Sequence, residues 1–143
     1  MRSVDPCFAK SEALYRRISI DQVDGDRILA SAVEMPACSF DRSKYSTRPE
    51  SVIDRAKPEF NGIAKLMVGD MPAPVSVFGV PDKGPPASYE FYPEDLPEPD
   101  NEAHSEVRIR ISGKPFRKRV NDRVAVAACE ALAAPMRVHT PPT

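Results

Sequence analysis

Prolines restrict the middle of this chain more than any other feature of the sequence. The chain has 16 prolines in 143 residues, about twice the average usage of roughly 5%. Eight of them fall between positions 72 and 99. A proline inside a helix removes a backbone hydrogen bond and clashes with the preceding turn. This stretch is therefore predicted to form short strands and loops in place of helices.

The clearest local pattern lies after this stretch. Positions 106–112 alternate between polar and apolar side chains, which predicts a strand whose apolar face carries Val107, Ile109 and Ile111. Apolar residues then recur at helical spacing over 116–134, and a proline follows. We therefore expect a C-terminal helix that packs on the apolar face of the strand.

The remaining segments complete one α+β domain, predicted to span residues 11–135. Further strands are predicted at 75–80 and 89–92, and a short helix is predicted near 49–56, where a hydroxyl cap and a proline precede an acidic residue. The expected fold is a small mixed or antiparallel sheet with the C-terminal helix on one face. Residues 1–10 and 136–143 are predicted to be flexible termini.

The composition excludes several classes of protein. A net charge of −1 gives no overall attraction to nucleic acid or to a membrane surface. The three cysteines lack CxxC spacing and there are only two histidines, so no metal site is expected. No cofactor motif is present. The longest apolar run is too short for a membrane span, and the N-terminus lacks the apolar core of a signal peptide. We expect a cytoplasmic protein without metal or cofactor.

The polar face of the predicted strand carries the candidate catalytic residues. His104 and Glu106 are two positions apart and would project from the same face. An imidazole and a carboxylate placed together could act as an acid–base pair. The alternative is that the charges on this face pair with one another in solvent and contribute little energy, which is a common arrangement in antiparallel sheets.

Four arginines are candidates for binding an anionic group or a partner. Arg108 and Arg110 follow on the same predicted strand face, and Arg16 and Arg17 lie near the N-terminus. Guanidinium groups bind carboxylates and phosphates through paired hydrogen bonds. A pocket that held these arginines beside the histidine and the glutamate would indicate catalysis, and dispersal would indicate a binding module.

Two charged segments flank the predicted strand. The loop over 94–102 carries five carboxylates among its prolines, and the segment 114–123 is rich in lysine and arginine. The basic segment could bind nucleic acid. Because the net charge is near zero, neutralisation within the protein is the favoured alternative.

Two resemblances bear on function. The order of Arg16, Ser39 and Glu106, within the local sequences L-Y-R, S-F and S-E-V, resembles the arginine–serine–glutamate progression of ADP-ribosyltransferase-like folds. The resemblance implies that Arg16 would bind NAD phosphates, Ser39 would order the nicotinamide-side strand and Glu106 would polarise a ribose hydroxyl. The chain departs from that pattern, because it has no S-T-S triplet at Ser39, no glycine after Arg16 and a histidine at position 104.

A wider pattern covers most of the chain. It consists of Y-R-R-I-S at 15–19, S-F-D-R at 39–42, R-P-E at 48–50, G-I-A at 62–64 and P-E-P-D-N-E-A-H-S-E-V at 97–107. This pattern resembles a group of small uncharacterised bacterial proteins. The resemblance implies a complete single-domain bacterial protein and carries no particular activity.

From these features we expect an accessory or interaction module. It would bind another protein through the acidic, proline-rich loop and the charged strand face. The alternative is a small enzyme that acts on a nucleotide or an NAD-like, phosphate-bearing substrate, with His104 and Glu106 as its acid–base pair. Nucleic acid and membrane are not expected partners, and the sequence leaves open whether the protein is an enzyme.

Overall fold

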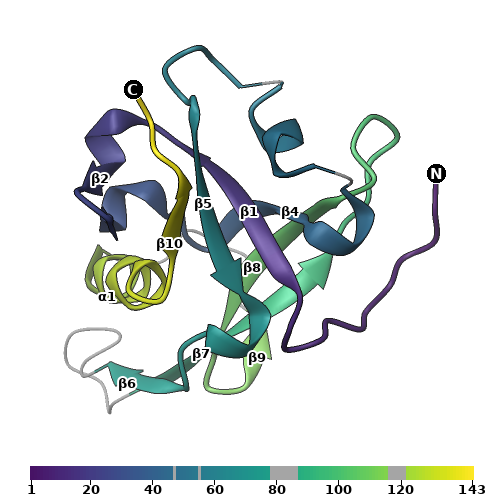
Figure 1. Cartoon of the computed structure of the whole chain (residues 1–143). Coiled ribbons are helices and arrows are strands. Elements are labelled where there is room, and N and C mark those ends of the chain that lie inside the picture. Colours follow the sequence, from purple (N-terminus) through teal and green to yellow (C-terminus); the bar gives the residue numbers. More distant parts are fainter. Residues whose placement is uncertain (47, 55, 78–86, 116–121) are drawn as a thin grey trace.

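One antiparallel sheet organises the molecule (Figure 1). The computed structural model describes residues 1–46, 48–54, 56–77, 87–115 and 122–143. The sheet order is β10-β5-β1-β4-β8-β7-β6, and the short β9 (Lys114–Pro115) pairs with β8. The seven ordered strands are β1 (Ala13–Ile18), β4 (Ala37–Arg42), β5 (Gly62–Met67), β6 (Val75–Val77), β7 (Ala87–Asp95), β8 (His104–Ile111) and β10 (Arg137–Thr140).

A single α-helix and several short elements complete the described chain. The helix α1 (Asp122–Ala133) lies between β9 and β10 in sequence. A small hairpin of β2 (Val23–Asp24) and β3 (Arg27–Ile28) turns at Gly25, whose φ of 61° suits glycine. The predicted α+β class is therefore confirmed, and every strand pair in the main sheet is antiparallel. The 3-10 turns are η1 (Ile20–Gln22), η2 (Ala30–Ala32), η3 (Ser43–Tyr45), η4 (Pro49–Val52) and η5 (Val68–Asp70).

Strands β7 and β8 form the longest ladder of the sheet, with seven residue pairs from Tyr89–Ile111 to Asp95–Ser105. The predicted strand at 89–92 is longer in the structure, because β7 continues through Pro93. Among the described strands, β6 pairs only with residues 87–89 of β7, so Pro93 lies on an edge where no described strand needs its missing N–H. The predicted strand at 75–80 is observed as β6, and residues 78–80 lie outside the described part of the chain.

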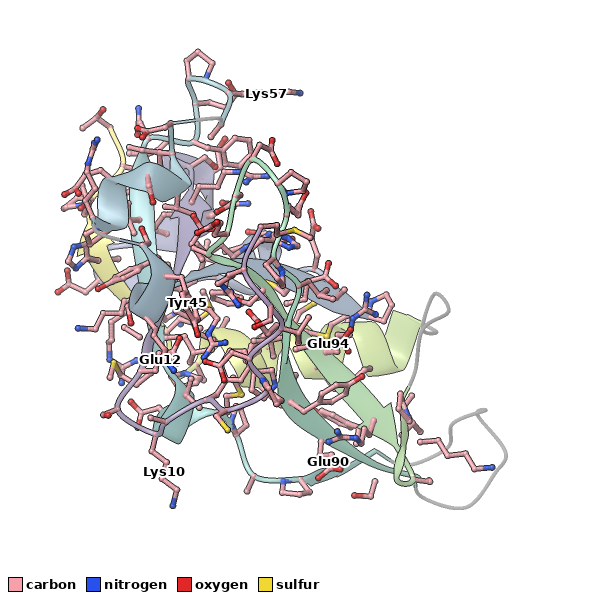
Figure 2. All side chains as sticks on the ribbon, turned by 90° about the vertical axis from the view of Figure 1, so that its right-hand side faces the viewer. Lys10, Glu12, Tyr45, Lys57, Glu90 and Glu94 are labelled. Carbon is pink, nitrogen blue, oxygen red and sulfur yellow. The ribbon has the colours of Figure 1, made fainter. Side chains whose placement is uncertain are left out.

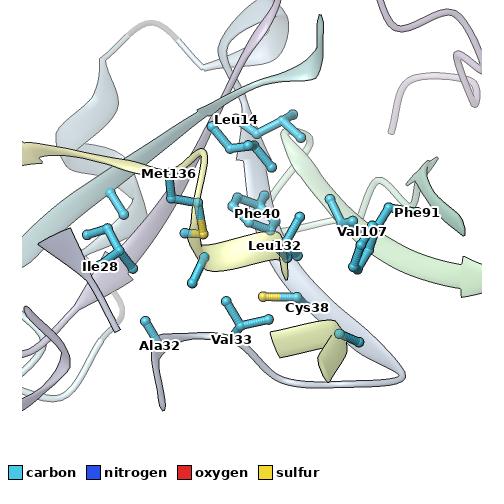
Figure 3. Close-up of a cluster of buried hydrophobic side chains, with 14 of the residues drawn as sticks. Leu14, Ile28, Ala32, Val33, Cys38, Phe40, Phe91, Val107, Leu132 and Met136 are labelled. Atoms are coloured by element: carbon cyan, nitrogen blue, oxygen red, sulfur yellow. The ribbon is translucent and has the colours of Figure 1, made fainter. Parts of the chain in front are cut away.

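The hydrophobic core lies between the sheet and α1 (Figure 3). Leu132 of the helix belongs to the same buried cluster as Val107 and Ile109 of β8 and Phe40 of β4, and none of the four is more than 1% exposed. This arrangement confirms the helix predicted on the apolar strand face. Alanine at 128 also lies in the cluster, and its small side chain lets the helix approach closely. Residues 116–121, where the sequence predicts the start of the helix, lie outside the described residues.

The helix predicted near 49–56 is only the short 3-10 turn η4 in the structure. Its hydrogen bonds connect residues three apart, as in Ile53 N–H to the carbonyl of Glu50 at 3.1 Å. Val52 is the one buried residue of this turn. A longer helix is stabilised mainly by packing of an apolar face, and one apolar anchor does not provide that face.

Both ends of the chain, predicted to be flexible, are instead joined to the sheet. Residues 137–140 form the edge strand β10, paired with β5, and Met136 is 1% exposed. Pro142 packs so closely on Gly62 that a Cβ there would lie 2.7 Å from the proline nitrogen. Residues 1–10 lie at the right of Figure 1, away from α1 and β10, and Arg2 and Asp5 are held there by ion pairs with Asp95 and Arg42. The sheet therefore extends beyond the predicted domain boundary at residue 135.

Candidate functional site

The outer face of β8 carries the predicted site residues. Burial alternates along the strand, so His104, Glu106, Arg108 and Arg110 lie on the face opposite Val107. The alternation predicted from the sequence is therefore observed. None of the four polar residues belongs to the core cluster.

The charged groups on this face are paired within the protein. Both Nε and Nη2 of Arg108 donate to Oε1 of Glu106, at 3.1 and 2.7 Å. Arg110 lies 3.5 Å from the carboxylate of Glu90, and its guanidinium stacks 3.8 Å from the ring centroid of Tyr92. The sequence left open the alternative that the charges on this face pair with one another, and the contacts observed here match that alternative.

The imidazole of His104 contacts the hairpin between β7 and β8. Its Nδ1 lies 2.9 Å from the carbonyl oxygen of Leu96 and 3.1 Å from a carboxylate oxygen of Glu98. Glu106, the expected acid–base partner, has its carboxylate contacted by Arg108. The described contacts therefore bring together His104 with Glu98, and Glu106 with Arg108, in two separate pairs.

Arg16 lies on the other side of the sheet. It projects from the same face of β1 as the core residues Leu14 and Ile18, and its Nε donates to the carbonyl of Ala32 at 2.6 Å. A second hydrogen bond, from Nη1 to the carbonyl of Ser39, measures 3.0 Å. Strands β1 and β4 are joined by only two residue pairs and then diverge. The two hydrogen bonds of Arg16 lie beyond those pairs. The guanidinium thus satisfies main-chain carbonyls on the core side, away from the outer face of β8.

Arg17 is exposed, and its side chain alternates with that of Arg16 on β1. It therefore shares the outer side of the sheet with Tyr15 and His104, because Tyr15 pairs with Asp41 and Asp41 pairs with His104. Arg17 lies beyond the two residue pairs that join β1 to β4. The predicted site residues are therefore dispersed over two faces.

A second group of charges, which sequence reasoning missed, surrounds Arg42 at the end of β4. The side chain of Arg42 is fully buried. Its Nε and Nη2 donate to the two carboxylate oxygens of Glu12 at 2.7 and 2.8 Å. Its Nη1 lies 3.2 Å from the carboxylate of Asp95, and the carbonyls of Asp5 and Cys7 accept from Nη1 and Nη2 at 2.8 and 2.7 Å.

The N-terminal segment supplies further members of this group. Arg2 makes a two-pronged ion pair with Asp95, at 2.6 and 2.7 Å, and its guanidinium lies 3.5 Å from the ring centroid of Tyr45. Asp5 accepts hydrogen bonds from Lys44 at 2.7 Å and from Tyr45 at 2.5 Å. We call this set the Arg42 cluster. It contains three cations and three carboxylates, namely Arg2, Arg42, Lys44, Asp5, Glu12 and Asp95.

The Arg42 cluster shifts the protonation of its members. Burial would raise the pKa of Asp95, but hydrogen bonds from Arg2, from the backbone amide of Asp5 and from Arg42 outweigh burial and lower that pKa. Hydrogen bonds from Lys44 and Tyr45 likewise lower the pKa of Asp5. The carboxylates of Asp5 and Asp95 therefore stay ionised and paired at neutral pH. With its charges matched, the cluster fixes the N-terminal segment to β4 and β7.

The turn between β7 and β8 is held in one shape. Backbone hydrogen bonds run both ways between Glu98 and Asn101, at 3.0 and 3.1 Å. The side chain of Asn101 donates to Asp41 at 2.9 Å and accepts from the backbone of Ala103 at 3.2 Å. We call residues 98–102 the acidic tip. Its Glu98, Asp100 and Glu102 are all exposed.

Metal-binding clusters and membrane-spanning helices are absent from the described ranges. No group of three or more histidine, cysteine, aspartate or glutamate side chains there has the placement that a metal ion needs. Of the helices in those ranges, none is long and apolar enough to cross a membrane. Cys38 is buried, which raises the pKa of its thiol, whereas Cys7 is exposed.

Comparisons with protein-family models, with curated proteins and with solved structures found no match to the chain. The two sequence resemblances therefore stay predictions. Two features bear on the resemblance to ADP-ribosyltransferase-like folds. Ser39 and Glu106 are register partners on neighbouring strands, whereas the guanidinium of Arg16 is bonded to main-chain carbonyls on the opposite side.

Proposed function

We propose that this protein is an interaction module that binds another protein through the acidic tip and the adjoining outer face of β8. The observation that carries the proposal is the tip itself, where exposed carboxylates project from a turn fixed by its own hydrogen bonds. Such a turn loses little conformational freedom on binding, so more of the interaction energy remains as affinity.

The charge of the tip defines the partner's chemistry. Glu98, Asp100 and Glu102 present three carboxylates within five residues. A complementary surface would carry lysine or arginine side chains, and mutual attraction would speed association at low ionic strength. The neighbouring pairs Glu106–Arg108 and Glu90–Arg110 add hydrogen-bonding groups of both signs, which favour one register of docking over others.

The alternative enzyme receives less support from the geometry. Acid–base catalysis by His104 and Glu106 needs both groups to reach one substrate atom. Here Glu106 is contacted by Arg108, and His104 points to Leu96 and Glu98. An enzyme of this kind would lose turnover of NAD or of a nucleotide on Glu106→Gln substitution. Equal turnover by wild type and Glu106→Gln would exclude this alternative.

The experiment for the interaction module compares two triple variants that remove the same charge. The test variant is Glu98→Gln/Asp100→Asn/Glu102→Gln, and the control variant is Glu50→Gln/Asp54→Asn/Glu59→Gln, whose residues are exposed elsewhere. Each protein is immobilised and exposed to a cell extract at low and at high salt. The proteins that it retains are identified by mass spectrometry. We expect wild type and control to retain the same partner at low salt, and the test variant to lose it. A failure of wild type to retain any protein, or an unchanged set with the test variant, would contradict the proposal.

A further inference from the structure

Basic side chains gather on the outer face of the sheet where β1, β5 and β10 lie side by side (Figure 1). Lys65 of β5 is flanked in register by Tyr15 of β1 and by Arg137 of β10. Arg17 lies two residues from Tyr15 and is therefore diagonal to Lys65 on the same face. Arg17 and Arg137 are exposed, and Lys65 is half-buried. We call Arg17, Lys65 and Arg137 the basic patch.

Among the described residues, the cations of the basic patch have no carboxylate partner. None of the ion pairs within the described ranges includes Arg17, Lys65 or Arg137. Nη1 of Arg137 donates to the carbonyls of Ala134 and Met136, both at 2.9 Å, which orients the guanidinium without bringing a negative side chain to it. Lys65 and Arg137 are direct register partners, and like charges in that position are destabilising. The fold therefore keeps a local repulsion that an anionic ligand would relieve.

Two aromatic rings stand beside the basic patch. His139 of β10 and Tyr15 of β1 have ring centroids 5.4 Å apart, with the planes tilted by 57°. The register of β10 shifts between Val138 and Thr140, so His139 is the extra residue of a β-bulge, a feature that redirects side chains. His139 is exposed and Tyr15 is half-buried. Both residues therefore keep accessible surface next to the cations.

The net charge of −1 is a property of the whole chain and does not describe this face. The three carboxylates of the Arg42 cluster are matched by its three cations, and three further carboxylates form the acidic tip. Figure 2 views the side of the molecule that is at the right of Figure 1, and Glu12, Glu90 and Glu94 are labelled on it, whereas β10 lies at the left of Figure 1. A near-neutral total is therefore compatible with a local positive surface, which the expectation of no nucleic-acid partner did not consider.

We infer that the basic patch and its two neighbouring rings bind single-stranded nucleic acid. The phosphates of the strand would pair with Arg17, Lys65 and Arg137, and an unpaired base would stack on His139 or Tyr15. Proteins bind single strands through cations that follow the backbone and through aromatic side chains on which the bases stack. An acidic polypeptide would use the cations but would give the rings no role. This surface differs from the acidic tip, whose partner is expected to be basic, and neither proposal depends on the other.

Fluorescence anisotropy of a labelled oligothymidylate, titrated with the full chain, tests the inference. Three phosphate contacts predict that the logarithm of the binding constant falls against the logarithm of salt concentration with a slope of about −2, since each contact in a single strand contributes roughly −0.7. Oligouridylate of the same length is titrated in parallel, and a preference between the two identifies DNA or RNA as the ligand. Duplex DNA should bind more weakly, because its bases are already stacked on one another. A glutamate peptide of the same charge should also bind more weakly, because it offers no bases.

Lys65→Gln should weaken binding at low salt and make the salt slope shallower by about 0.7. The substitution also relieves the repulsion with Arg137, so the free protein should be equally stable or slightly more stable in urea. A purely structural role of Lys65 would give the opposite result, a loss of stability. Lys114→Gln is the matched control, because it removes the same charge from the exposed strand β9, in the basic segment 114–123, and it should leave affinity unchanged.

The contribution of the rings is tested at position 139. His139→Ala should lower affinity at least about fivefold, the effect of losing one stacked base. His139→Phe keeps an aromatic ring at the same place, so affinity should be retained. Urea midpoints of both variants show whether the fold is intact.

Three outcomes would overturn the inference. The first is the absence of binding by either single strand at low salt, or equal affinity of wild type and Lys65→Gln. The second is a loss of binding with Lys114→Gln, which would assign nucleic acid to the basic segment. The third is equal or tighter binding of the glutamate peptide, which would assign the basic patch to an acidic protein or to the acidic tip of a second copy. The triple variant at positions 98, 100 and 102 keeps the basic patch, so it should bind the oligonucleotide at least as tightly as wild type does, and this separates the inference from the proposed function.

Discussion

Arg42 and Arg108 are arginines of neighbouring strands in one sheet, yet their surroundings differ completely. Arg42 is fully buried and binds groups of Asp5, Glu12 and Asp95, which are at least 30 residues away in sequence. The side chain of Arg108 remains 16% exposed, and it pairs with a glutamate two residues away on its own strand. The first arginine joins distant segments, whereas the second pairs within its own strand.

The difference shows where charge contributes to the fold and where it remains available at the surface. Removing one partner from a buried group leaves an uncompensated charge in a poorly solvated place. A partly exposed pair gains little energy, because water and salt screen it. The Arg42 cluster is therefore expected to act in stability, and the outer face of β8 in recognition.

The largest expected effect comes from Arg42→Met. The substitution leaves the carboxylates of Glu12 and Asp95 without their shared cation, so the free energy of unfolding should fall by about 3–5 kcal/mol. Urea denaturation followed by circular dichroism measures the change. Arg17→Met, at an exposed position of β1, is the control and should change stability by less than about 0.5 kcal/mol. Equal effects of the two variants would end the distinction between the two regions.

A smaller effect is expected from acid. In the folded protein the pKa of Asp95 lies below its ordinary value of 3.8, so the unfolded chain takes up a proton first as the pH falls. The stability that Asp95 contributes is therefore present above about pH 4 and is lost as the pH drops through the lowered folded pKa.

Asp95→Asn should flatten this acid dependence, because position 95 no longer titrates. Urea midpoints measured from neutral pH downwards should show a wild-type advantage at neutral pH that narrows in acid. The Glu106→Gln variant provides the comparison on the outer face. A gap between wild type and Asp95→Asn that stays constant with pH would show that the Asp95 carboxylate does not drive the acid loss.

The pair on the outer face should contribute less. A double-mutant cycle with Glu106→Gln and Arg108→Gln isolates their interaction, which we expect to be about 0.2–1 kcal/mol, as for other partly exposed pairs. Thermal unfolding of the four proteins gives the value. A coupling energy as large as the loss of stability expected for Arg42→Met would show that this pair stabilises the fold as strongly as the buried cluster does.

The smallest effect is expected at Arg110→Gln. Its contact with Glu90 is 3.5 Å long, and the two side chains are 36% and 41% exposed. The loss of stability should be below about 0.5 kcal/mol and should disappear at high salt, because the Debye length shortens. Melting temperatures at low and high salt measure it. A loss that persists at high salt would indicate that stacking on Tyr92 is the larger part of the interaction.

Local patterns in the sequence predicted the parts of the fold that depend on neighbouring residues. The alternation around Val107 and Ile109 specified β8 and its two faces, and helical spacing specified α1. Both patterns act within a few residues, so a single sequence reveals them. The charged outer face was also predicted, because its residues share one strand.

Long-range contacts explain what the sequence did not predict. The four residues of β10 form a strand because β5 supplies their hydrogen-bond partners, and nothing adjacent to Arg137 indicates that pairing. Arg42 comes directly after a short alternating pattern that predicts a strand. Nothing near it in the sequence indicates that Glu12 and Asp95 contact its side chain. Arg16 was assigned to an anion site, but in the fold it donates to the main-chain carbonyls of Ala32 and Ser39, and no local pattern indicates those contacts.

The position of β5 within the sheet has a consequence for folding during synthesis. Strand β5 pairs on one side with β1 and on the other with β10, which follows the other described strands in the sequence. The residues of the Arg42 cluster are all present once position 95 has been synthesised. A nascent chain can therefore close its buried ionic centre early, while one edge of β5 stays unpaired until residues 137–140 have been synthesised. During that interval the open edge is exposed to pairing with other chains, so the ribosome-bound intermediate is where aggregation of this protein would begin.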